Sequence, residues 1–326
     1  MTIPASRETE PEWIDPTPED REAIGHLVTA VRHADGVDAW SEAVLLDLAT
    51  PTGHGRHLVV RADDGSLAAW AHVDTADPDD VVVELGVAPG ARRHGVATSL
   101  ARALLADPAV RPGQARVWAH GERPGSAELA AALGLDRDRE LWMMRRPADA
   151  GPLPAQRPVE GVTISPLRVG EDEPDVVAVN ARAFAWHPEQ GAMTVDDVRR
   201  REQEPWFDAE GFLLAREDAT GDLLGFHWTK VHPEGARDGG PVGEVYVVGV
   251  DPGAQGRGLG GALTLAGLHH LAGRGHDEVI LYVEADNAAA VATYRRLAFA
   301  VDATDVSFRL PDVTSAPSGG DDDAGR

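Results

Sequence analysis

A glycine-rich turn is the stretch whose residue types point most directly to binding chemistry. It follows the apolar run Val245–Val250, passes through Asp251-Pro252-Gly253, and leads into an apolar-periodic helix near Gly258. Glycines at positions 256, 258, 260 and 261 remove Cβ atoms where a ligand must approach the main chain. Free N–H groups and the positive end of the helix dipole then predict an anion site suited to a pyrophosphate, with Arg257 adding a charge-assisted contact.

The spacing of this turn differs from that of the common nucleotide-binding motifs. No Lys-Ser/Thr pair follows the glycines, which excludes a P-loop, and the pattern is Gln255-x-x-Gly258-x-Gly260 instead of Gly-x-Gly-x-x-Gly. A Gln/Arg-x-x-Gly-x-Gly/Ala turn between a strand and a helix resembles the acetyl-CoA signature of the GNAT-type N-acetyltransferases. The alternative interpretation is that this turn is an ordinary connection between a strand and a helix and binds no ligand. Four glycines between positions 256 and 261, at an otherwise acceptable helix start, argue against it.

Two residues near this turn have the chemistry that acetyl transfer from a thioester to an amine requires. The amine must lose a proton, the carbonyl must be polarised, and the leaving thiolate must be protonated. Glu244, on the strand before the turn, can take the ammonium proton directly or through a water. Tyr294, on the helix after the next strand, can protonate the thiolate. Two plainer interpretations stay open: Glu244 as a salt-bridge partner at a strand edge, and Tyr294 as core, since Val291, Tyr294 and Leu297 share a helix face.

The sequence contains this strand–turn–helix unit twice. Residues 87–95 match residues 250–258, an offset of 163 (258 minus 95), with Val, Pro, Gly, Ala and Gly recurring at matching places. The resemblance therefore implies an α/β (α+β) fold of two tandem GNAT acetyltransferase domains. Each is expected to have a mixed, mainly antiparallel central sheet flanked by helices.

The two copies differ in the residues that do chemistry. At the repeat offset Val81 stands opposite Glu244, and Ala130 lies near the place of Tyr294. Arg123-Pro124-Gly125 replaces the helix start led by Asn287. We therefore predict that the second copy is catalytic. The first is expected to be a degenerate, non-catalytic copy that keeps a cradle for acetyl-CoA.

A closer resemblance concerns nearly the whole chain. Asn287-x-x-Ala290-x-x-x-Tyr294 resembles the second GNAT signature, in which this helix packs beside the pantetheine arm. The tandem layout, residues 243–250, residues 282–287 and the loop His187-Pro188-Glu189-Gln190-Gly191 together resemble a tandem branch of the family in actinobacteria. Those enzymes acetylate the cysteinyl amine of a cysteinyl-glucosaminyl-inositol and release CoA.

Carried over residue by residue, this resemblance implies three sets of contacts. The substrate contacts are Glu42, Glu189, Lys230, Glu244 and Tyr282. The acetyl-CoA contacts of the second copy are Val248, Gly249, Val250, Gln255, Gly256, Arg257, Gly258, Leu259, Gly260, Gly261, Asn287, Ala288, Ala289, Ala290, Val291 and Ala292. Those of the first copy are Leu85, Gly86, Val87, Arg93, His94, Gly95, Val96, Ala97 and Thr98. Carboxylates suit a polyhydroxyl substrate that carries an ammonium group. Two departures from the family pattern are Leu297-Ala298-Phe299, which lacks a Gly before the aromatic residue, and an insertion at 233–240.

Periodicity and turn residues place these motifs on definite elements. In the first copy we predict a helix beginning at Thr17-Pro18-Glu19-Asp20. Beyond it we expect a helix at 41–48, a hairpin of 58–61 with 67–73, strands at 81–87, 117–119 and 141–145, and a helix at 126–133. In the second copy we expect strands at 162–165, 212–216, 224–232, 245–250, 279–284 and 306–310. Its helices are expected near 172–184, after Thr194, from Gly258 to about 272, and at 287–297, with 185–191 as a loop.

Composition and charge bound the remaining questions. The 326 residues suffice for two domains, which we place at 1–146 and 161–310, joined by a Pro-rich linker at 147–160 and followed by a disordered acidic tail at 311–326. The chain has no cysteine, which excludes a disulfide, a thiolate metal site and an acetyl-cysteine intermediate. A formal charge of −24 argues against a nucleic-acid partner. With no bilayer-length apolar run and no signal-peptide core, we expect the protein in the cytoplasm. We also expect a monomer and no metal.

Two alternatives remain at this stage. An acetyltransferase for a protein N-terminus or an aminoglycoside would share the cofactor residues and differ in the loop around Glu189. A non-catalytic acetyl-CoA sensor, built from two degenerate copies, is the alternative of another class. Glu244 and Tyr294 argue against the sensor.

Overall fold

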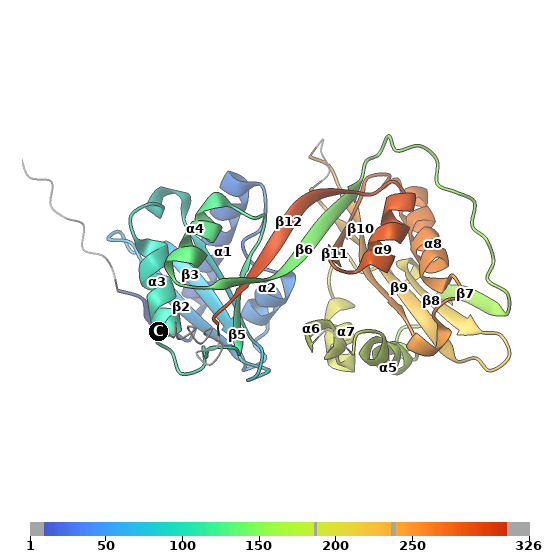
Figure 1. Ribbon diagram of the computed structural model, residues 1–326, viewed down its shortest axis with the longest axis horizontal. Coiled ribbons are helices and arrows are strands. Elements are labelled where there is room, and N and C mark those ends of the chain that lie inside the picture. Colours follow the sequence, from blue (N-terminus) through green and yellow to red (C-terminus); the bar gives the residue numbers. More distant parts are fainter. Residues whose placement is uncertain (1–9, 186–187, 236–238, 312–326) are drawn as a thin grey trace, which may run out of the picture. The chain divides into compact units, whose positions relative to one another are not determined.

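The computed structural model describes residues 10–185, 188–235 and 239–311, apart from the side chains of Pro124, Pro188 and Glu189 (Figure 1). Contacts divide the chain into two compact units. Unit 1 comprises the residues up to Glu140 together with those from Thr304 onward, and unit 2 comprises Leu141–Ala303. Among the described residues, no helix has the length and apolar character that crossing a membrane requires.

Unit 1 is built on a mixed sheet in which β4 and β5 run parallel and the other pairs described are antiparallel. In chain order its elements are β1 (Glu12–Ile14), α1 (Pro18–Asp35), α2 (Glu42–Ala49), β2 (Gly55–Arg61), β3 (Leu67–Asp74), β4 (Val81–Val87), η1 (Pro89–Ala91), α3 (Val96–Leu105), β5 (Ala115–Ala119) and α4 (Pro124–Ala132). Helices α1 and α2 pack against one face of the sheet around Trp40 and Trp70. Helix α3 packs against the other face through Leu100 and Leu104.

Unit 2 repeats this plan, with β10 and β11 as its parallel pair. Its elements are β7 (Val162–Pro166), α5 (Glu173–Ala183), α6 (Pro188–Gly191), α7 (Val195–Arg201), η2 (Ala209–Gly211), β8 (Phe212–Glu217), β9 (Leu223–His232), β10 (Val242–Val250), η3 (Pro252–Ala254), α8 (Leu259–Gly273), β11 (Val279–Glu284) and α9 (Ala288–Arg296). Helices α5 and α7 pack with Phe212 and Trp228 on one face, and α8 and α9 pack on the other (Figure 1).

Two strands, β6 (Asp136–Arg146) and β12 (Ala300–Arg309), have residues in both units. Within unit 2, residues 141–146 of β6 pair antiparallel with β11. Within unit 1, residues 306–309 of β12 pair antiparallel with β5. Each copy of the repeat thus ends in a strand that completes a sheet made mainly by the other copy. The unit bounds consequently differ from the ranges 1–146 and 161–310 that the sequence suggested.

The fold class is confirmed, and most element positions agree with the sequence-based prediction. Thr17 and Thr194 both form the expected N-caps, each with a complete capping box. Three differences stand out. Residues 188–191, predicted as loop, form the short helix α6; strand β1 was missed; and β12 begins at Ala300 instead of 306. A three-residue edge strand and a one-turn helix give periodicity too little length to detect.

Candidate functional site

The central strand of unit 2, β10, stops pairing with its neighbour β11 about halfway along its length. Parallel pairing of β10 with β11 covers Gly243–Val245 and ends there, while β10 continues to Val250. The register of β10 against β9 shifts between Val245 and Val247, which is the signature of a β-bulge. Beyond the bulge, the main-chain edge at 248–250 makes no ladder with β11 within the described part of the chain. Residues 248–250 are the β10 residues for which the family resemblance implies contact with acetyl-CoA.

The glycine turn after β10 has the conformation that its sequence predicts. Gly256 and Gly258 both have φ of 81°, in the left-handed region that favours glycine, and Gly258 is the N-cap of α8. A Cβ at Gly260 would meet only Val250 Cγ2 at 3.8 Å, and one at Gly261 would meet nothing within 4 Å. Packing within the protein therefore does not explain the last two glycines, and the space beside their main chain is open.

The start of α8 also offers hydrogen-bond donors. No side chain caps this 15-residue helix, so its first N–H groups and its dipole are available to an anion. The sequence predicts that Arg257 contacts the bound anion. In the structure its guanidinium instead pairs with Glu217 at 2.7 Å. Gly249 has a packing explanation instead, since a Cβ there would lie 2.7 Å from Phe226 Cε1. The turn thus fits a pyrophosphate through its main chain.

Glu244 is a buried carboxylate just before the bulge. Its residue is 5% exposed, and one of its carboxylate oxygens lies 2.6 Å from Nε2 of His232. His232 is the last residue of β9, two places beyond the position opposite Glu244, so the two side chains share a face of the sheet. The sequence gave no signal for His232, because the contact depends on the β9–β10 register.

Lys230 lies directly opposite Glu244 in the β9–β10 ladder and is also buried. Its Nζ sits 4.7 Å from the ring centroid of Trp206 and 5.1 Å from that of Tyr246, which is a cation–π arrangement. The structure therefore brings two of the predicted substrate residues together on one face. The aromatic pair around Lys230 was not foreseen.

Tyr294 lies on α9 in the core that α8 and α9 form with β10 and β11. Its ring meets Phe299 edge to face at 5.9 Å, and its hydroxyl makes no hydrogen bond with the described residues. Burial raises the pKa of Tyr294 to about 12, so the phenol is protonated at neutral pH. Both the catalytic and the core interpretation of Tyr294 remain compatible with this position.

Most of the remaining predicted contacts of unit 2 lie at the surface or at helix ends, and Val291 lies in the core. Asn287 is the N-cap of α9, and its side chain accepts a hydrogen bond from the Ala290 N–H at 3.2 Å. Val291 points into the core, whereas Ala288, Ala289 and Ala292 are exposed. Tyr282, on β11, is 46% exposed. Glu189 lies in α6, and its side chain falls outside the described part of the structure.

Glu42, the remaining predicted substrate contact, belongs to unit 1, where it is the first residue of α2. Glu42 takes part in an interaction with another residue. Ser41 precedes it as the N-cap of the helix, and the Ser41 N–H donates to a Glu84 carboxylate oxygen at 2.5 Å. The start of α2 is thereby fixed to strand β4.

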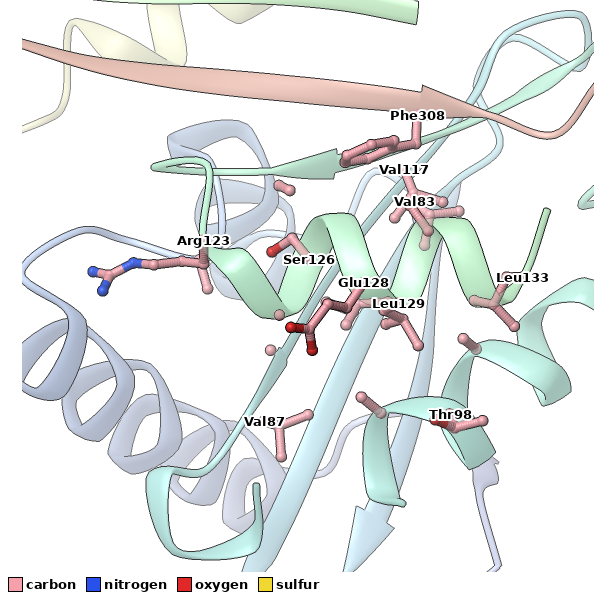
Figure 2. Close-up of a pocket in the computed structure, with 18 of the residues that line it drawn as sticks. Val83, Val87, Thr98, Val117, Arg123, Ser126, Glu128, Leu129, Leu133 and Phe308 are labelled. Atoms are coloured by element: carbon pink, nitrogen blue, oxygen red, sulfur yellow. The ribbon is translucent and has the colours of Figure 1, made fainter. Parts of the chain in front are cut away.

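Unit 1 has a pocket of about 660 Å³ at the place predicted for its cofactor. Ladder pairing of β4 with β5 ends at Glu84, and residues 85–87 line the pocket beyond that point. In Figure 2, Val87 and Thr98 lie across the pocket from Glu128 and Leu129 of α4. Of the nine cofactor residues expected in this copy, His94 is outside the pocket lining. The other eight line it: Leu85, Gly86, Val87, Arg93, Gly95, Val96, Ala97 and Thr98.

The two glycine turns have the same backbone conformation. Gly95 (φ 86°) matches Gly258, and Arg93 (φ 64°) matches Gly256, although arginine carries a Cβ that disfavours this region. The guanidinium of Arg93 pairs with Glu128 at 2.9 Å on the surface. Arg92, one residue earlier, pairs with both carboxylate oxygens of Asp35 at 2.7 and 2.8 Å. The first copy has therefore kept the shape of the turn although arginine replaces one of its two left-handed glycines.

A buried ionic group beside this pocket was not predicted. His120, which lines the pocket, lies with Nδ1 2.9 Å from Asp305 and with Nε2 3.4 Å from Glu84. Burial opposes its charge, but the hydrogen bond to Asp305 and the negative charges of both carboxylates outweigh that cost and raise the pKa of His120 to about 10. Val81, at the offset of Glu244, is buried, as its apolar character implies. Unit 1 does carry a buried carboxylate on β4, that of Glu84, which lies three residues after Val81.

Comparison with known proteins gives consistent matches over the chain. A sequence profile described as the Acetyltransferase (GNAT) family matches residues 14–134 and again 180–299. A mycothiol acetyltransferase of Actinosynnema mirum is 53% identical over 296 residues, which are 90% of this chain and 96% of that protein. One of Saccharopolyspora erythraea is 50% identical, covering 86% of this chain and 99% of that protein.

Solved structures share the fold. A GCN5-related N-acetyltransferase from Sphaerobacter thermophilus is 27% identical, with a TM-score of 0.65 over 92% of this chain and 95% of that chain. A tandem GNAT protein from the clavulanic acid biosynthesis pathway is 21% identical, with a TM-score of 0.67 over 92% of this chain and 98% of that chain. Two GNAT units in one chain are therefore a recurring architecture.

Proposed function

Because the chain belongs to the GNAT acetyltransferases and, within them, to the mycothiol acetyltransferases, we propose that unit 2 carries the catalytic site. There it transfers the acetyl group of acetyl-CoA to the cysteinyl amine of cysteinyl-glucosaminyl-inositol, which yields mycothiol and CoA. The chain is thus an N-acetyltransferase of mycothiol synthesis. The division of labour between its units, and the roles of single residues, are the proposed part.

One observation carries the assignment to unit 2. Only five residues, 245–249, lie between Glu244 and Val250, the last residue of β10, and the bulge lies among them. The glycine turn follows directly after Val250. The carboxylate and the anion-binding helix start therefore lie on either side of the place where β10 leaves β11. At the offset position of unit 1, Val81 has no group that accepts a proton.

Glu244 is the proposed base. Its carboxylate accepts the proton of the substrate ammonium, and the neutral amine then attacks the thioester carbon. His232, hydrogen-bonded to the carboxylate, fixes its orientation and supplies a route by which the proton leaves. The main chain of β10 beyond the bulge supplies N–H groups to polarise the carbonyl. When acetyl-CoA is bound, it supplies the activated acetyl group.

Tyr294 is proposed to assist departure of the CoA sulfur. A phenol whose pKa is about 12 is fully protonated at neutral pH, as a donor must be. Thiols ordinarily have a pKa of about 8.5, so such a phenol stabilises the developing thiolate chiefly through its hydrogen bond. The proton that the attacking nitrogen loses balances the one that CoA finally carries. Breakage of the C–S bond and formation of the C–N bond complete the reaction.

Acceptor recognition in unit 2 is proposed to use Lys230, Tyr282 and Glu189 besides Glu244, while the role of Glu42 in unit 1 stays a prediction from the sequence resemblance. Lys230 supports this role by its position opposite Glu244, and Tyr282 by its exposure on β11, one residue past the last pair that β11 forms with β10. In unit 1, the pocket of about 660 Å³ supports retention of a cofactor site without chemistry.

Mass spectrometry of competitive reactions tests the proposed function. The purified protein receives acetyl-CoA and an equimolar mixture of the cysteinyl pseudodisaccharide, free cysteine and glucosamine. We expect one acetyl group on the cysteinyl amine of the pseudodisaccharide and no comparable product from the other two acceptors. Acetylation of free cysteine or glucosamine at an equal rate would refute the acceptor assignment. Absence of any turnover would refute the enzyme assignment.

A further inference from the structure

A buried cluster of metal-binding side chains lies in unit 1, on the face of the sheet that α2 covers. Asp47 comes from α2, His57 from β2 and His72 from β3. His57 and His72 stand directly opposite each other in the β2–β3 ladder, so their rings project from the same face. One ring nitrogen of each histidine and one oxygen of Asp47 all lie within 4.8 Å of one another. The three residues are 6%, 2% and 9% exposed for His57, His72 and Asp47.

Surrounding groups hold the Asp47 carboxylate in place from behind. Its Oδ1 accepts hydrogen bonds from the Thr52 N–H at 2.8 Å and from the Thr52 hydroxyl at 2.6 Å. Its Oδ2 is left to face Nε2 of His72 at 3.2 Å. Gly55 leaves room on this side, because a Cβ there would overlap Oδ2. A carboxylate anchored through one oxygen and presented through the other is the usual arrangement at a metal site.

His57 supplies an independent observation. It is nine-tenths buried, and its Nδ1 has no hydrogen-bond partner in the described part of the protein. A buried polar atom without a hydrogen-bond partner destabilises the folded state, and a bound ion at such an atom would remove that penalty. Trp70 stacks on the His57 ring with centroids 6.0 Å apart and limits its movement.

We propose that Asp47, His57 and His72 bind a divalent transition-metal ion, Zn²⁺ under physiological conditions. Two imidazoles and a carboxylate match zinc, whereas Mg²⁺ and Ca²⁺ prefer oxygen ligands throughout. In a tetrahedral zinc site, ligand atoms lie about 3.3 Å apart, which is near the Asp47–His72 spacing of 3.2 Å. The three ligand atoms lie at most 4.8 Å apart, so the His57 nitrogen needs to approach the other two by no more than about 1.5 Å when the ion binds. A water completes the coordination.

Such an ion would fasten α2 to β2 and β3. The other end of α2 begins at Glu42, and Glu84 already holds the residue before it through the Ser41 N–H. Both ends of the helix would then be fixed to the sheet, one by a hydrogen bond and one by the ion. The inference does not depend on the proposed reaction, because its residues and its readouts lie in unit 1 alone.

Metal binding to the tag-free, chelator-treated full chain tests the proposal. Co²⁺ serves as a spectroscopic probe for the zinc position, and Zn²⁺ is titrated by calorimetry. We expect one Co²⁺ per chain, with visible absorption of a four-coordinate ion that Zn²⁺ displaces, and a higher Tm in the presence of Zn²⁺. If the wild-type chain shows no stoichiometric binding of either ion, the proposal is wrong and the cluster is a hydrogen-bonded core group.

Three variants locate the ion. His57→Gln and His72→Gln each remove a direct ligand, so each should weaken binding by more than the about 10- to 100-fold that loss of an outer partner costs. His54→Gln is the matched control, because His54 is an exposed histidine just before β2, and it should bind like wild type. Undiminished binding in both ligand variants would place the ion elsewhere and overturn the proposal.

The wild-type chain also offers a test that does not depend on folded variants. The protein has 13 histidines, and their imidazole nitrogens can be followed by ¹⁵N NMR during Zn²⁺ addition. We expect two imidazoles to shift in step with the first equivalent of Zn²⁺ and the other resonances to stay in place. Shifts spread over many histidines would indicate adventitious surface binding and would contradict the proposal.

Discussion

Replacing Glu244 by glutamine separates catalysis from folding at the proposed base. Glutamine has the same size and can keep a hydrogen bond with Nε2 of His232, which lies 2.6 Å from the carboxylate. The variant loses the charge assistance of that bond, but it also no longer buries a charge at a position only 5% exposed. We expect these effects to offset within about 1 kcal/mol, or roughly 2–4 °C in Tm.

The effect of Glu244→Gln on turnover should be much larger. Loss of a positioned general base typically costs about 10²- to 10⁴-fold in kcat, which corresponds to about 2.7–5.4 kcal/mol in the barrier. The deprotonated fraction of the substrate amine rises about tenfold per pH unit below its own pKa. The activity of the variant should therefore rise with that slope as the pH increases, while the wild type levels off earlier.

The assay combines chromatographic detection of the N-acetylated product with thermal unfolding and calorimetric titration of acetyl-CoA. Glu210→Gln is the control, because Glu210 is an exposed glutamate of the same unit, and it should behave like wild type. A kcat within about threefold of wild type at neutral pH, in a protein that unfolds normally and binds acetyl-CoA, would refute the base assignment.

Five further substitutions test other residues. Tyr294→Phe should slow turnover about tenfold or more while acetyl-CoA affinity survives; a large fall in Tm with unchanged kcat would make Tyr294 a core residue. Gly258→Glu should abolish turnover yet leave one CoA bound per chain, whereas Gly95→Glu should remove that CoA and spare most turnover; calorimetric stoichiometry with kinetics would expose the reverse assignment. His120, whose folded pKa of about 10 exceeds its unfolded value of about 6.5, stabilises the fold fully below pH 6.5 and loses this contribution as the pH rises through 10. Calorimetric Tm values should thus fall between pH 7 and 10 in the wild type but not in His120→Gln. Ala298→Gly should raise stability by about 0.5–1 kcal/mol in denaturant titrations, since Ala298 has φ of 67°.

Local features of the chain could be predicted because local chemistry determines them. The capping hydroxyls of Thr17 and Thr194 lie within three residues of the groups they bind. The left-handed glycines at 256 and 258 follow from a turn that only glycine adopts without strain. The missing glycine before Phe299 is an instructive exception. Ala298 adopts the left-handed conformation itself, so the turn is kept at a cost of about 1 kcal/mol.

Contacts that depend on strand register could not be predicted from local sequence. His232 meets Glu244 only because β9 and β10 align in one way, and a shift by one residue would put the histidine on the other face. His120 acquires its charge from Asp305, 185 residues away. The cluster of Asp47, His57 and His72 likewise assembles from a helix and two strands. The predicted chemistry of Glu244, Tyr294 and the substrate contacts stays a proposal that the variants above test.

The course of β12 affects how the protein can fold during its synthesis. Unit 1 receives the strand that pairs with β5 from residues beyond Thr304, about 160 residues after Glu140 (304 minus 140). At about 5–20 residues per second, the ribosome needs roughly 8–30 s to make that stretch. During this interval β5 has an open edge, and His120 lacks the partner Asp305. The nascent first copy must therefore wait with an unpaired strand, and a chaperone or a transient substitute strand has time to bind there before the last residues arrive.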